Sequence, residues 1–325
     1  LIDFDIEWLY GEKNDNIVSC RITPEYLDAF LAPREVTAVY LPSPDYAGNM
    51  LDIAALSEVC HRHGTLLLVD NAHGAYLRFL PHSAHPIDLG ADASCDSAHK
   101  TLPVLTGGGY LHIGKNAPKI FSEQADRAMA LFASTSPSYL ILQSLDCANA
   151  YLEESYRERL AAFIEKVAAM KARLPFETVG CEPLKLTLAP KSYGYTGAEI
   201  AEILSRAGFV CEFADADLVV MMLTPELSDE ALNGLEDALR SIPRRDAIVK
   251  KAPAVVIGNA VMSPREAIFK PSEDIDVRTA VGRVLAASCI SCPPAVPIAV
   301  CGEVITEETV RLLEYYGIST ISVVK

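Results

Sequence analysis

Short apolar runs alternate with amphipathic stretches along the first half of the chain. Residues 36–44 (VTAVYLPSP) predict a buried strand that ends in a turn, and residues 65–70 (TLLLVD) predict a second strand covered on both faces. Between them, residues 50–64 carry apolar side chains at helical spacing, and Gly64 stands where a helix C-cap belongs. Strand, helix and strand in this order predict a βαβ unit, and therefore a parallel sheet with a right-handed crossover.

The second half predicts a helical connection followed by two smaller units. Residues 138–174 have a long helical pattern, and residues 183–241 alternate strand and helix patterns. The polar, basic stretch 243–253 is typical of a linker. Beyond it we expect helices over 276–287 and 306–315 and a final strand over 319–324. We therefore expect three domains, with the boundaries 1–150, 151–245 and 246–325.

Charge and composition narrow the class of protein. The net charge is −15 with a pI near 4.9, which disfavours nucleic-acid binding and suits a cationic small molecule, although solubility alone explains many acidic chains. No run of about eighteen apolar residues and no secretory signal is present. The nine cysteines are scattered, which favours free thiols in a cytoplasmic protein without a membrane span.

Two groups of residues can carry chemistry together. The stretch DSAHK (96–100) places Lys100 beside Ser97 and His99 just past a strand, and the apolar run before it in the chain ends on Asp70. A lysine can form an imine with the aldehyde of pyridoxal 5′-phosphate (PLP), while a hydroxyl and an imidazole bind its phosphate. An aspartate beside the ring nitrogen keeps that nitrogen protonated, which would explain a carboxylate at the end of a buried strand. Ala72 is small enough for the ring to lie against it.

Each signal alone has an ordinary structural explanation. A lysine after a strand is usually just exposed, and an aspartate there often forms a turn or caps a helix. The order of the two groups, both expected at the ends of parallel strands, favours a PLP site because ligands bind at that edge of a sheet.

The stretch from VDNAHGAYLRFLP to DSAHKTLPVLTGGGYLHI resembles the bacterial Orn/Lys/Arg decarboxylases of the aspartate-aminotransferase-like type. The resemblance continues in the following stretches: SPDYAGNMLDI, TSPSYLILQSLDCA, SPREAIF, AVGRV and CPPAVPIAVCGE. It implies a PLP enzyme of fold type I: an α/β large domain with a mostly parallel sheet that is incomplete at its N-terminus, a small α/β domain and a C-terminal α+β decarboxylase-type segment. It also implies a homodimer or a higher homo-oligomer.

The resemblance implies a role for several residues. Lys100 matches the lysine that bonds to PLP, and Asp70 matches the partner of the pyridine nitrogen. Ser97 and His99 match phosphate-side residues. His73 matches a histidine near the ring. The other matching positions are Thr135 and Ser136, which approach the phosphate across the dimer interface in the family, and Glu303, which lies near the distal cationic group of the substrate.

The chain also departs from the family pattern. Asn71 replaces a glutamate and Tyr76 replaces a histidine, which leaves the substrate open. A substantial N-terminal stretch that holds a phosphate loop and a ring-stacking histidine in the family is not found before residue 1. We therefore expect this sequence to belong to a longer protein, with a short and inactive homologue as the alternative.

The expected reaction is decarboxylation of a basic amino acid to a polyamine-type product and carbon dioxide. Asp70, His73 and Lys100 would carry it, with either His73 or Lys100 returning a proton to Cα. An aminotransferase is the alternative enzyme, since all fold-type-I enzymes share the lysine and aspartate. Glu212 and Asp215 could face the substrate or lie at the surface.

No metal site is expected. Cys60, His61 and His63 lack a second cluster of ligands, and the pair Cys289 and Cys292 lacks a second pair.

Overall fold

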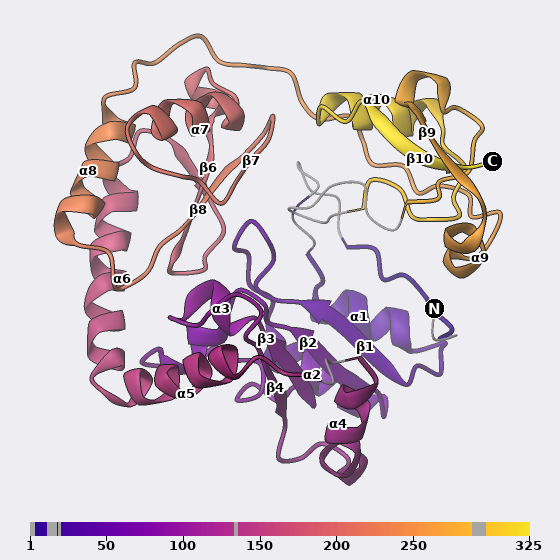
Figure 1. Cartoon of the computed structure of the whole chain (residues 1–325), viewed down its shortest axis with the longest axis horizontal. Coiled ribbons are helices and arrows are strands. Elements are labelled where there is room, and N and C mark those ends of the chain that lie inside the picture. Colours follow the sequence, from indigo (N-terminus) through magenta and orange to yellow (C-terminus); the bar gives the residue numbers. More distant parts are fainter. Residues whose placement is uncertain (1–3, 12–17, 19–20, 133–135, 288–296) are drawn as a thin grey trace.

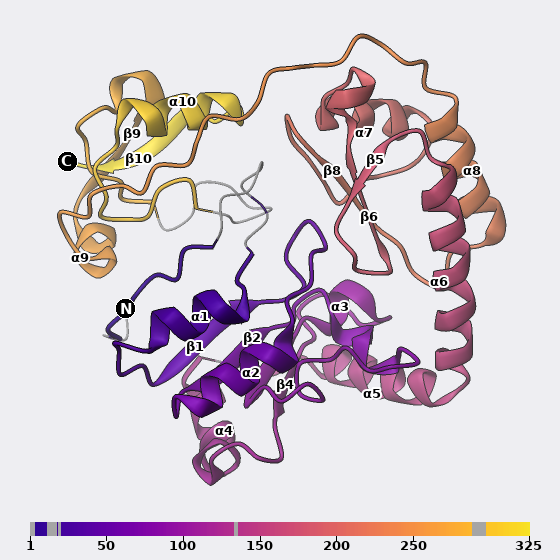
Figure 2. The ribbon, with the colours of Figure 1, turned by 180° about the vertical axis from the view of Figure 1, so that it is seen from behind.

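The computed structural model describes residues 4–11, 18, 21–132, 136–287 and 297–325. Figures 1 and 2 show three groups of elements: a sheet with helices at the bottom, a second sheet with long helices beside it, and a smaller C-terminal group. A strand-free segment between α8 and α9 arches from the second group to the third. Within the described residues, no helix is long and apolar enough to cross a membrane.

The first group contains a four-stranded sheet in the order β1-β2-β3-β4. The first three strands are parallel, and β4 is antiparallel to β3. The helix α2 (Ile53–Arg62) connects β1 to β2, which confirms the predicted strand–helix–strand unit. The strands are β1 (Ala38–Pro42), β2 (Leu66–Asp70), β3 (Ala93–Asp96) and β4 (Tyr110–Ile113).

The two faces of this sheet are covered unequally. The helices α1 (Pro24–Leu31) and α2 pack on one face around buried Leu27, Leu56 and Leu67. On the other face lies α4 (Lys119–Phe132), which buries no residue of its own and leaves a cavity of about 440 Å³ against the strands. Burial therefore alternates along β2 between buried and half-buried residues, so the predicted cover on both faces is complete on one face and partial on the other.

The predicted helical connection consists of two helices. α5 (Tyr139–Glu153) and α6 (Tyr156–Arg173) are separated at Ser155, whose φ of 50° is left-handed. A residue in that conformation cannot continue a right-handed helix. The chain therefore turns between the two helices, and α6 runs up to the second sheet (Figure 1).

The second sheet has the order β5-β6-β8-β7, with antiparallel neighbours throughout. α6, α7 (Gly197–Arg206) and α8 (Asp229–Arg240) contribute buried side chains to its core. α7 begins with a capping box in which the Thr196 hydroxyl and the Glu199 carboxylate each bond the other's backbone N–H. The strands are β5 (Glu177–Val179), β6 (Lys185–Ala189), β7 (Phe213–Ala214) and β8 (Val219–Met222).

The C-terminal group pairs β9 (Ser272–Asp276) with β10 (Thr320–Val324) and includes α9 (Pro264–Phe269) and α10 (Glu307–Tyr315). The last two predicted elements are confirmed in α10 and β10. The predicted helix over 276–287 is wrong, because only a 3₁₀ turn, Val277–Thr279, forms there. Gly282 follows with a left-handed φ of 81°, and Leu285 bridges to β10. Cys289 and Cys292 lie outside the described residues.

Candidate functional site

Asp70 and Lys100 lie at the same edge of the large sheet. Asp70 is the last residue of β2, and it is in register with Cys95 of the parallel neighbour β3. β3 ends one residue later, and Ser97 then stands at the N-cap position of the short helix α3 (Ala98–Thr101) that carries Lys100. Because parallel strands end at a common edge, the two predicted groups lie beyond neighbouring strand ends, where α/β sheets bind ligands.

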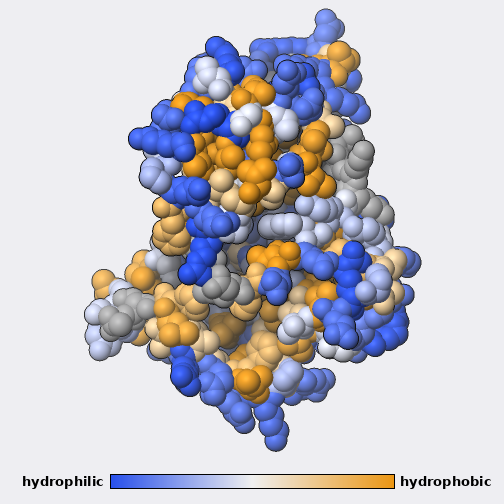
Figure 3. Space-filling model, turned by 90° about the vertical axis from the view of Figure 1, so that its right-hand side faces the viewer, coloured by the Kyte–Doolittle hydropathy of each residue, from blue (hydrophilic) through white to orange (hydrophobic). Residues whose placement is uncertain are grey.

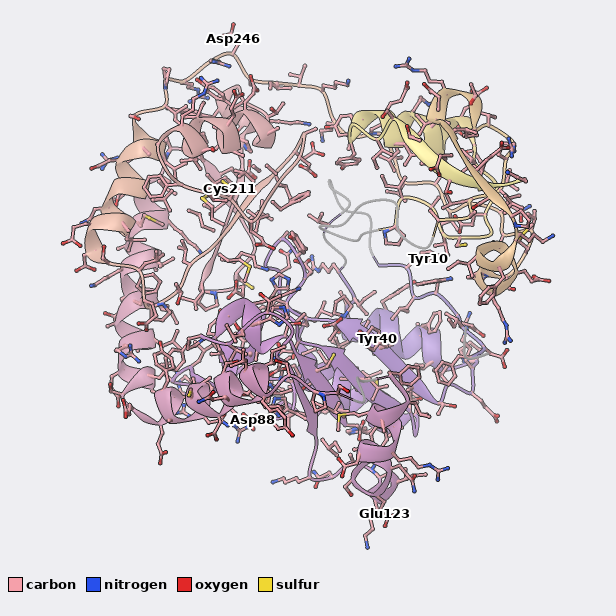
Figure 4. The ribbon with its side chains drawn as sticks, viewed as in Figure 1. Tyr10, Tyr40, Asp88, Glu123, Cys211 and Asp246 are labelled. Carbon is pink, nitrogen blue, oxygen red and sulfur yellow. The ribbon has the colours of Figure 1, made fainter. Side chains whose placement is uncertain are left out.

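Asp70 is half-buried, with two hydrogen-bond donors. Its Oδ2 accepts from the hydroxyl of Tyr40 at 2.8 Å, and its Oδ1 accepts from the backbone N–H of Ala72 at 3.1 Å. Burial and the bond to Asp70 raise the pKa of Tyr40. The carboxylate at the end of this strand is only half-buried, because α4 covers its side of the sheet only in part. Tyr40 lies on β1 beside that edge (Figure 4), and nothing in its sequence context indicated the pairing.

Lys100 contacts His73 directly. Its Nζ lies 3.3 Å from His73 Nε2, which brings together the two residues predicted to be catalytic. On its other side, His73 Nδ1 lies 3.1 Å from Nζ of Lys185, a lysine of β6 in the second sheet. Burial first, and then the charges of Lys185 and Lys100, lower the pKa of His73 to about 3. The ring is therefore neutral at physiological pH.

Sequence reasoning missed Lys185. It lies in the predicted strand LKLTLAP, at a position where a lysine normally faces solvent. Its burial in the folded chain, with 3% of the residue exposed, and its contact with His73 identify it as a site residue.

Ser97 and His99 flank the lysine as expected, and both are half-buried. The Ser97 side chain makes no capping bond to α3. His99 Nδ1 lies 2.8 Å from the carbonyl oxygen of Gly108, which can only accept, so the proton of the neutral ring is on Nδ1. Nε2 of His99 can donate to an anion only when the ring carries both protons.

The remaining predicted residues are not gathered at this edge. Ser136 is exposed just before α5, and Thr135 lies outside the described residues. Glu303 is half-buried in the C-terminal group, where its carboxylate accepts from the backbone N–H of Val300 at 2.9 Å. That group lies well apart from α3 in Figures 1 and 2, so a single chain does not bring Glu303 to Lys100.

The two departures from the family pattern are both buried. Tyr76 is fully buried, and its hydroxyl bonds to the carboxyl group of Glu182. Burial raises the pKa of Glu182 to about 7, while nearby Lys185 and backbone N–H groups oppose the rise. Asn71 is fully buried and donates through Nδ2 to Asp96 Oδ1 at 2.8 Å.

Asp96 is the centre of a cluster that sequence reasoning also missed. Its Oδ2 lies 3.0 Å from His85 Nε2 and 3.1 Å from His112 Nε2. Burial opposes ionisation, but the bonds from His112, His85 and Asn71 outweigh it and lower the pKa of Asp96 to about 2.

The three side chains of this cluster are close enough to hold a metal ion. However, the backbone N–H of Ile87 donates to His85 Nδ1 at 3.3 Å, so His85 carries its proton on Nε2 and donates it to Asp96. A metal at Nε2 would require the opposite tautomer, so the geometry favours a hydrogen-bonded network. The cysteine and histidines that were considered for a metal have different partners and do not share a ligand. Cys60 is in the core, His61 bonds to Asp92 and His63 bonds to Asp28.

A cavity of about 860 Å³ lies elsewhere. Its lining comes from the loop after β1, the second sheet and the segment 248–252, and includes Asp45, Lys191, Asp217 and Lys250. Neither Asp70 nor Lys100 lines it. We therefore locate the site from the side chains at the sheet edge and not from cavity size.

Comparison with known families accounts for most of the chain. The family model described as Orn/Lys/Arg decarboxylase, major domain, matches residues 22–179, and the model of the C-terminal domain matches residues 247–321. The chain belongs to the Orn/Lys/Arg decarboxylase family. Enzymes of this family are PLP-dependent amino-acid decarboxylases that act on basic amino acids. The predicted family resemblance is confirmed.

Individual relatives agree with the family match. An uncharacterized protein of Bacillus subtilis, YaaO, is 29% identical over 88% of this chain and 63% of its own length. The arginine decarboxylase of the same organism is also 29% identical, over 83% of this chain and 60% of its length. This chain therefore spans less than two thirds of the curated relatives that it matches.

Solved structures confirm the fold. Lysine decarboxylase A from Pseudomonas aeruginosa matches 98% of this chain and 63% of its own, with a TM-score of 0.77 and 16% identity. Serine palmitoyltransferase from Sphingomonas wittichii, also 16% identical, matches 67% of this chain and 58% of its own with a TM-score of 0.54. These likenesses confirm the predicted α/β architecture of PLP fold type I.

Proposed function

We propose that this chain carries the cofactor site of a PLP-dependent decarboxylase whose substrate is arginine, lysine or ornithine. One observation supports this most strongly. In a chain of the Orn/Lys/Arg decarboxylase family, Asp70 and Lys100 follow neighbouring parallel strands at one sheet edge. That arrangement supplies an amine and a carboxylate to one ligand.

The donor chemistry of the edge fits PLP. Asp70 offers two carboxylate oxygens, each with one donor already and a lone pair left for a ring N–H. Ala72 has a small side chain, and Ser97 keeps its hydroxyl out of the cap of α3. Lys100 is exposed, so its amine is accessible to a ligand at the edge.

When bound, PLP supplies an electron sink for the bond that breaks at Cα. The chain's own residues would hold and orient it: Lys100 would bond to it, Asp70 would keep the pyridine nitrogen protonated, and Ser97 and His99, the latter with both ring nitrogens protonated, would hold the phosphate. Of the two groups expected to return a proton to Cα, we assign this role to Lys100. His73 is neutral at physiological pH, and the N–H of a neutral imidazole is a very weak acid.

A cationic substrate agrees with the charge of the chain, which is −15 overall. We propose that Glu303 binds the distal amine or guanidinium from the C-terminal group of another copy, since one chain keeps it away from Lys100. Figure 3 shows apolar patches on one side of the molecule. Large apolar side chains on α4 and α5 are also exposed and suit an interface between copies: Ile120, Leu131, Tyr139 and Leu140.

Borohydride reduction of the full-length protein with PLP tests the cofactor site. We expect a pyridoxyl label on Lys100, located by peptide mapping and lost in K100A, while K115A, which removes an exposed lysine, keeps it. Carbon dioxide release from arginine, lysine and ornithine then assigns the substrate. Sedimentation measures whether the protein is at least a dimer. A folded full-length protein that is not labelled on Lys100 would refute the proposal and favour an inactive homologue, and transamination without carbon dioxide would favour an aminotransferase.

A further inference from the structure

The second sheet and the C-terminal group are connected by a cluster of four bonded side chains, which we call the joint: Lys191, Asp217, Tyr315 and Tyr316. Lys191 lies in a 3₁₀ turn, Pro190–Tyr193, that follows β6, and Asp217 lies in the turn between β7 and β8. Tyr315 is the last residue of α10, and Tyr316 follows it. Only 18% of the Lys191 side chain and 11% of the Asp217 side chain are exposed, so the bonds of the joint lie largely out of water.

The donors and acceptors of the joint match one another. The Lys191 ammonium donates to the carboxylate of Asp217 and to the hydroxyl of Tyr315, and its third hydrogen goes to the carbonyl oxygen of Lys250 at 2.8 Å. Tyr315 donates in turn to Asp217 Oδ1 at 2.7 Å, and Tyr316 donates to Oδ2 at 3.0 Å. Burial opposes the charge of Lys191, but its bonds to Asp217 and Tyr315 outweigh burial and raise its pKa. Such a satisfied network makes a rigid, specific contact.

The turn that carries Asp217 is itself fixed. Asp215 Oδ1 accepts from the backbone N–H groups of Asp217 and Leu218, both at 2.7 Å. Asp215, which could have faced the substrate, therefore shapes this turn and holds Asp217 towards the C-terminal group.

The segment between α8 and α9 is bonded near both of its ends. Near its start, the backbone N–H of Ile248 donates to the carbonyl oxygen of Lys191 at 2.9 Å. Near its end, the carbonyl oxygen of Asn259 accepts from the backbone N–H of Val304 at 3.0 Å. The segment therefore runs from the joint to the residue that follows Glu303.

Glu303 belongs to the same packed unit as the two tyrosines. Ile305, two residues further along, and Leu313 of α10 are both fully buried in the core of the C-terminal group. The Glu303 carboxylate packs on Gly258, where a side chain would begin only 2.6 Å from Oε2. Because a close-packed core transmits displacements, the position of α10 determines that of Glu303.

We propose that the side chains of the joint are positioning residues, which hold the C-terminal group on the second sheet and thereby fix Glu303 where it binds the distal cation of the substrate. This rests on the proposed function, because Glu303 is the residue that is positioned. Loss of the joint would let the C-terminal group shift and misplace Glu303. Lys100 and Asp70 would be unaffected, since they lie at the edge of the large sheet.

Steady-state kinetics of the full-length protein measure this effect. We expect D217A and Y315F/Y316F to raise the KM for carbon dioxide release about tenfold, the effect of misplacing one bond to a charged group, and to leave kcat within about twofold. The PLP label on Lys100 should persist in both. The double tyrosine variant keeps both aromatic rings and serves alone if D217A does not fold. An unchanged KM in Y315F/Y316F would overturn the proposal.

E314Q is the matched control. Glu314 precedes the joint on α10, but it pairs with Arg278 at 2.9 Å within the C-terminal group, and both side chains are exposed. We expect E314Q to leave the KM unchanged. An equal rise in E314Q and Y315F/Y316F would mean a general disturbance of α10 and would overturn the proposal.

A double-mutant cycle shows whether the joint acts through Glu303. E303Q alone should raise the KM, and adding Y315F/Y316F to it should cause no further rise. A full tenfold further rise would mean that the tyrosines act on another residue, which would refute the positioning of Glu303. An unchanged KM in E303Q would instead count against the proposed function, because Glu303 would then not bind the substrate.

Limited proteolysis tests the joint without substrate or cofactor. Trypsin can cut after Lys250 only when this segment leaves the joint, because the Lys250 carbonyl oxygen is bonded to Lys191. We expect Y315F/Y316F to speed this cut about tenfold relative to the cut after exposed Lys115, since cleavage follows local opening. Equal rates in the variant and the wild type would overturn the proposal. Faster cleavage in a protein that PLP does not label would support the joint and count against the proposed function alone.

Discussion

Replacing Asp96 with asparagine removes the anion on which two buried donors, Asn71 and His85, and the half-buried His112 converge. The carboxylate accepts from Asn71, His85 and His112, and only 4% of the residue is exposed. An amide keeps the size of the side chain but loses the charge and turns one acceptor into a donor. We therefore expect D96N to fold with a weakened edge between β2 and β3.

The pKa of Asp96 gives the size of the stability that the carboxylate contributes. The bonds to the carboxylate lower it from 3.8 to about 2. At about 1.36 kcal/mol per pH unit, this corresponds to about 2.4 kcal/mol of stability near neutral pH. Because the folded pKa is depressed, the contribution is complete above pH 3.8 and is lost as the pH falls through about 2. Near pH 3 about half of it should remain.

Hydrogen–deuterium exchange of peptides from β2 and β3 measures this local stability. Near neutral pH, these peptides should exchange roughly 50-fold faster in D96N than in the wild type, and the ratio should shrink near pH 3. The control D126N alters an exposed aspartate of α4 and should leave the ratio near one. The reasoning would be refuted if D96N exchanged like the wild type. It would also be refuted if the ratio of the two exchange rates stayed the same near pH 3 as near neutral pH.

Three further predictions concern the site and its support. D70N should keep the PLP label on Lys100 but lower carbon dioxide release at least about hundredfold, because a neutral amide cannot hold the ring-nitrogen proton; an equal rate in D70N would contradict this. Burial raises the pKa of Glu182 from 4.5 to about 7, so the stability that its protonated form contributes is lost as the pH rises from 4.5 through about 7. The urea midpoint of wild type should therefore fall relative to that of E182Q between pH 4.5 and about 7, and the difference between the two midpoints should stay constant at higher pH. T196A removes the hydroxyl of the capping box and should cost about 1 kcal/mol in urea unfolding, whereas T196S should cost much less; equal losses in the two variants would exclude the cap as the cause.

Local patterns were sufficient for much of the fold. Apolar runs and helical spacing predicted β1, α2 and β2, and the alternation over 183–241 predicted the second sheet and its helices. Each of these elements buries one face, so the period of its apolar side chains identifies it. The predicted helix over 276–287 failed because Gly282 has a left-handed φ and Leu285 packs into the core from an irregular segment.

The sequence by itself determined the family, the fold class, and the placement of Asp70 and Lys100 at one edge of the sheet, because residues that follow adjacent parallel strands lie at a common edge. Only the tertiary structure decided what surrounds them. Tyr40 reaches Asp70 from a neighbouring strand, and Lys185 reaches His73 across 112 positions of the chain. Hydrogen-bond direction and burial arise from groups brought together by packing, so no local pattern records which histidine nitrogen carries the proton.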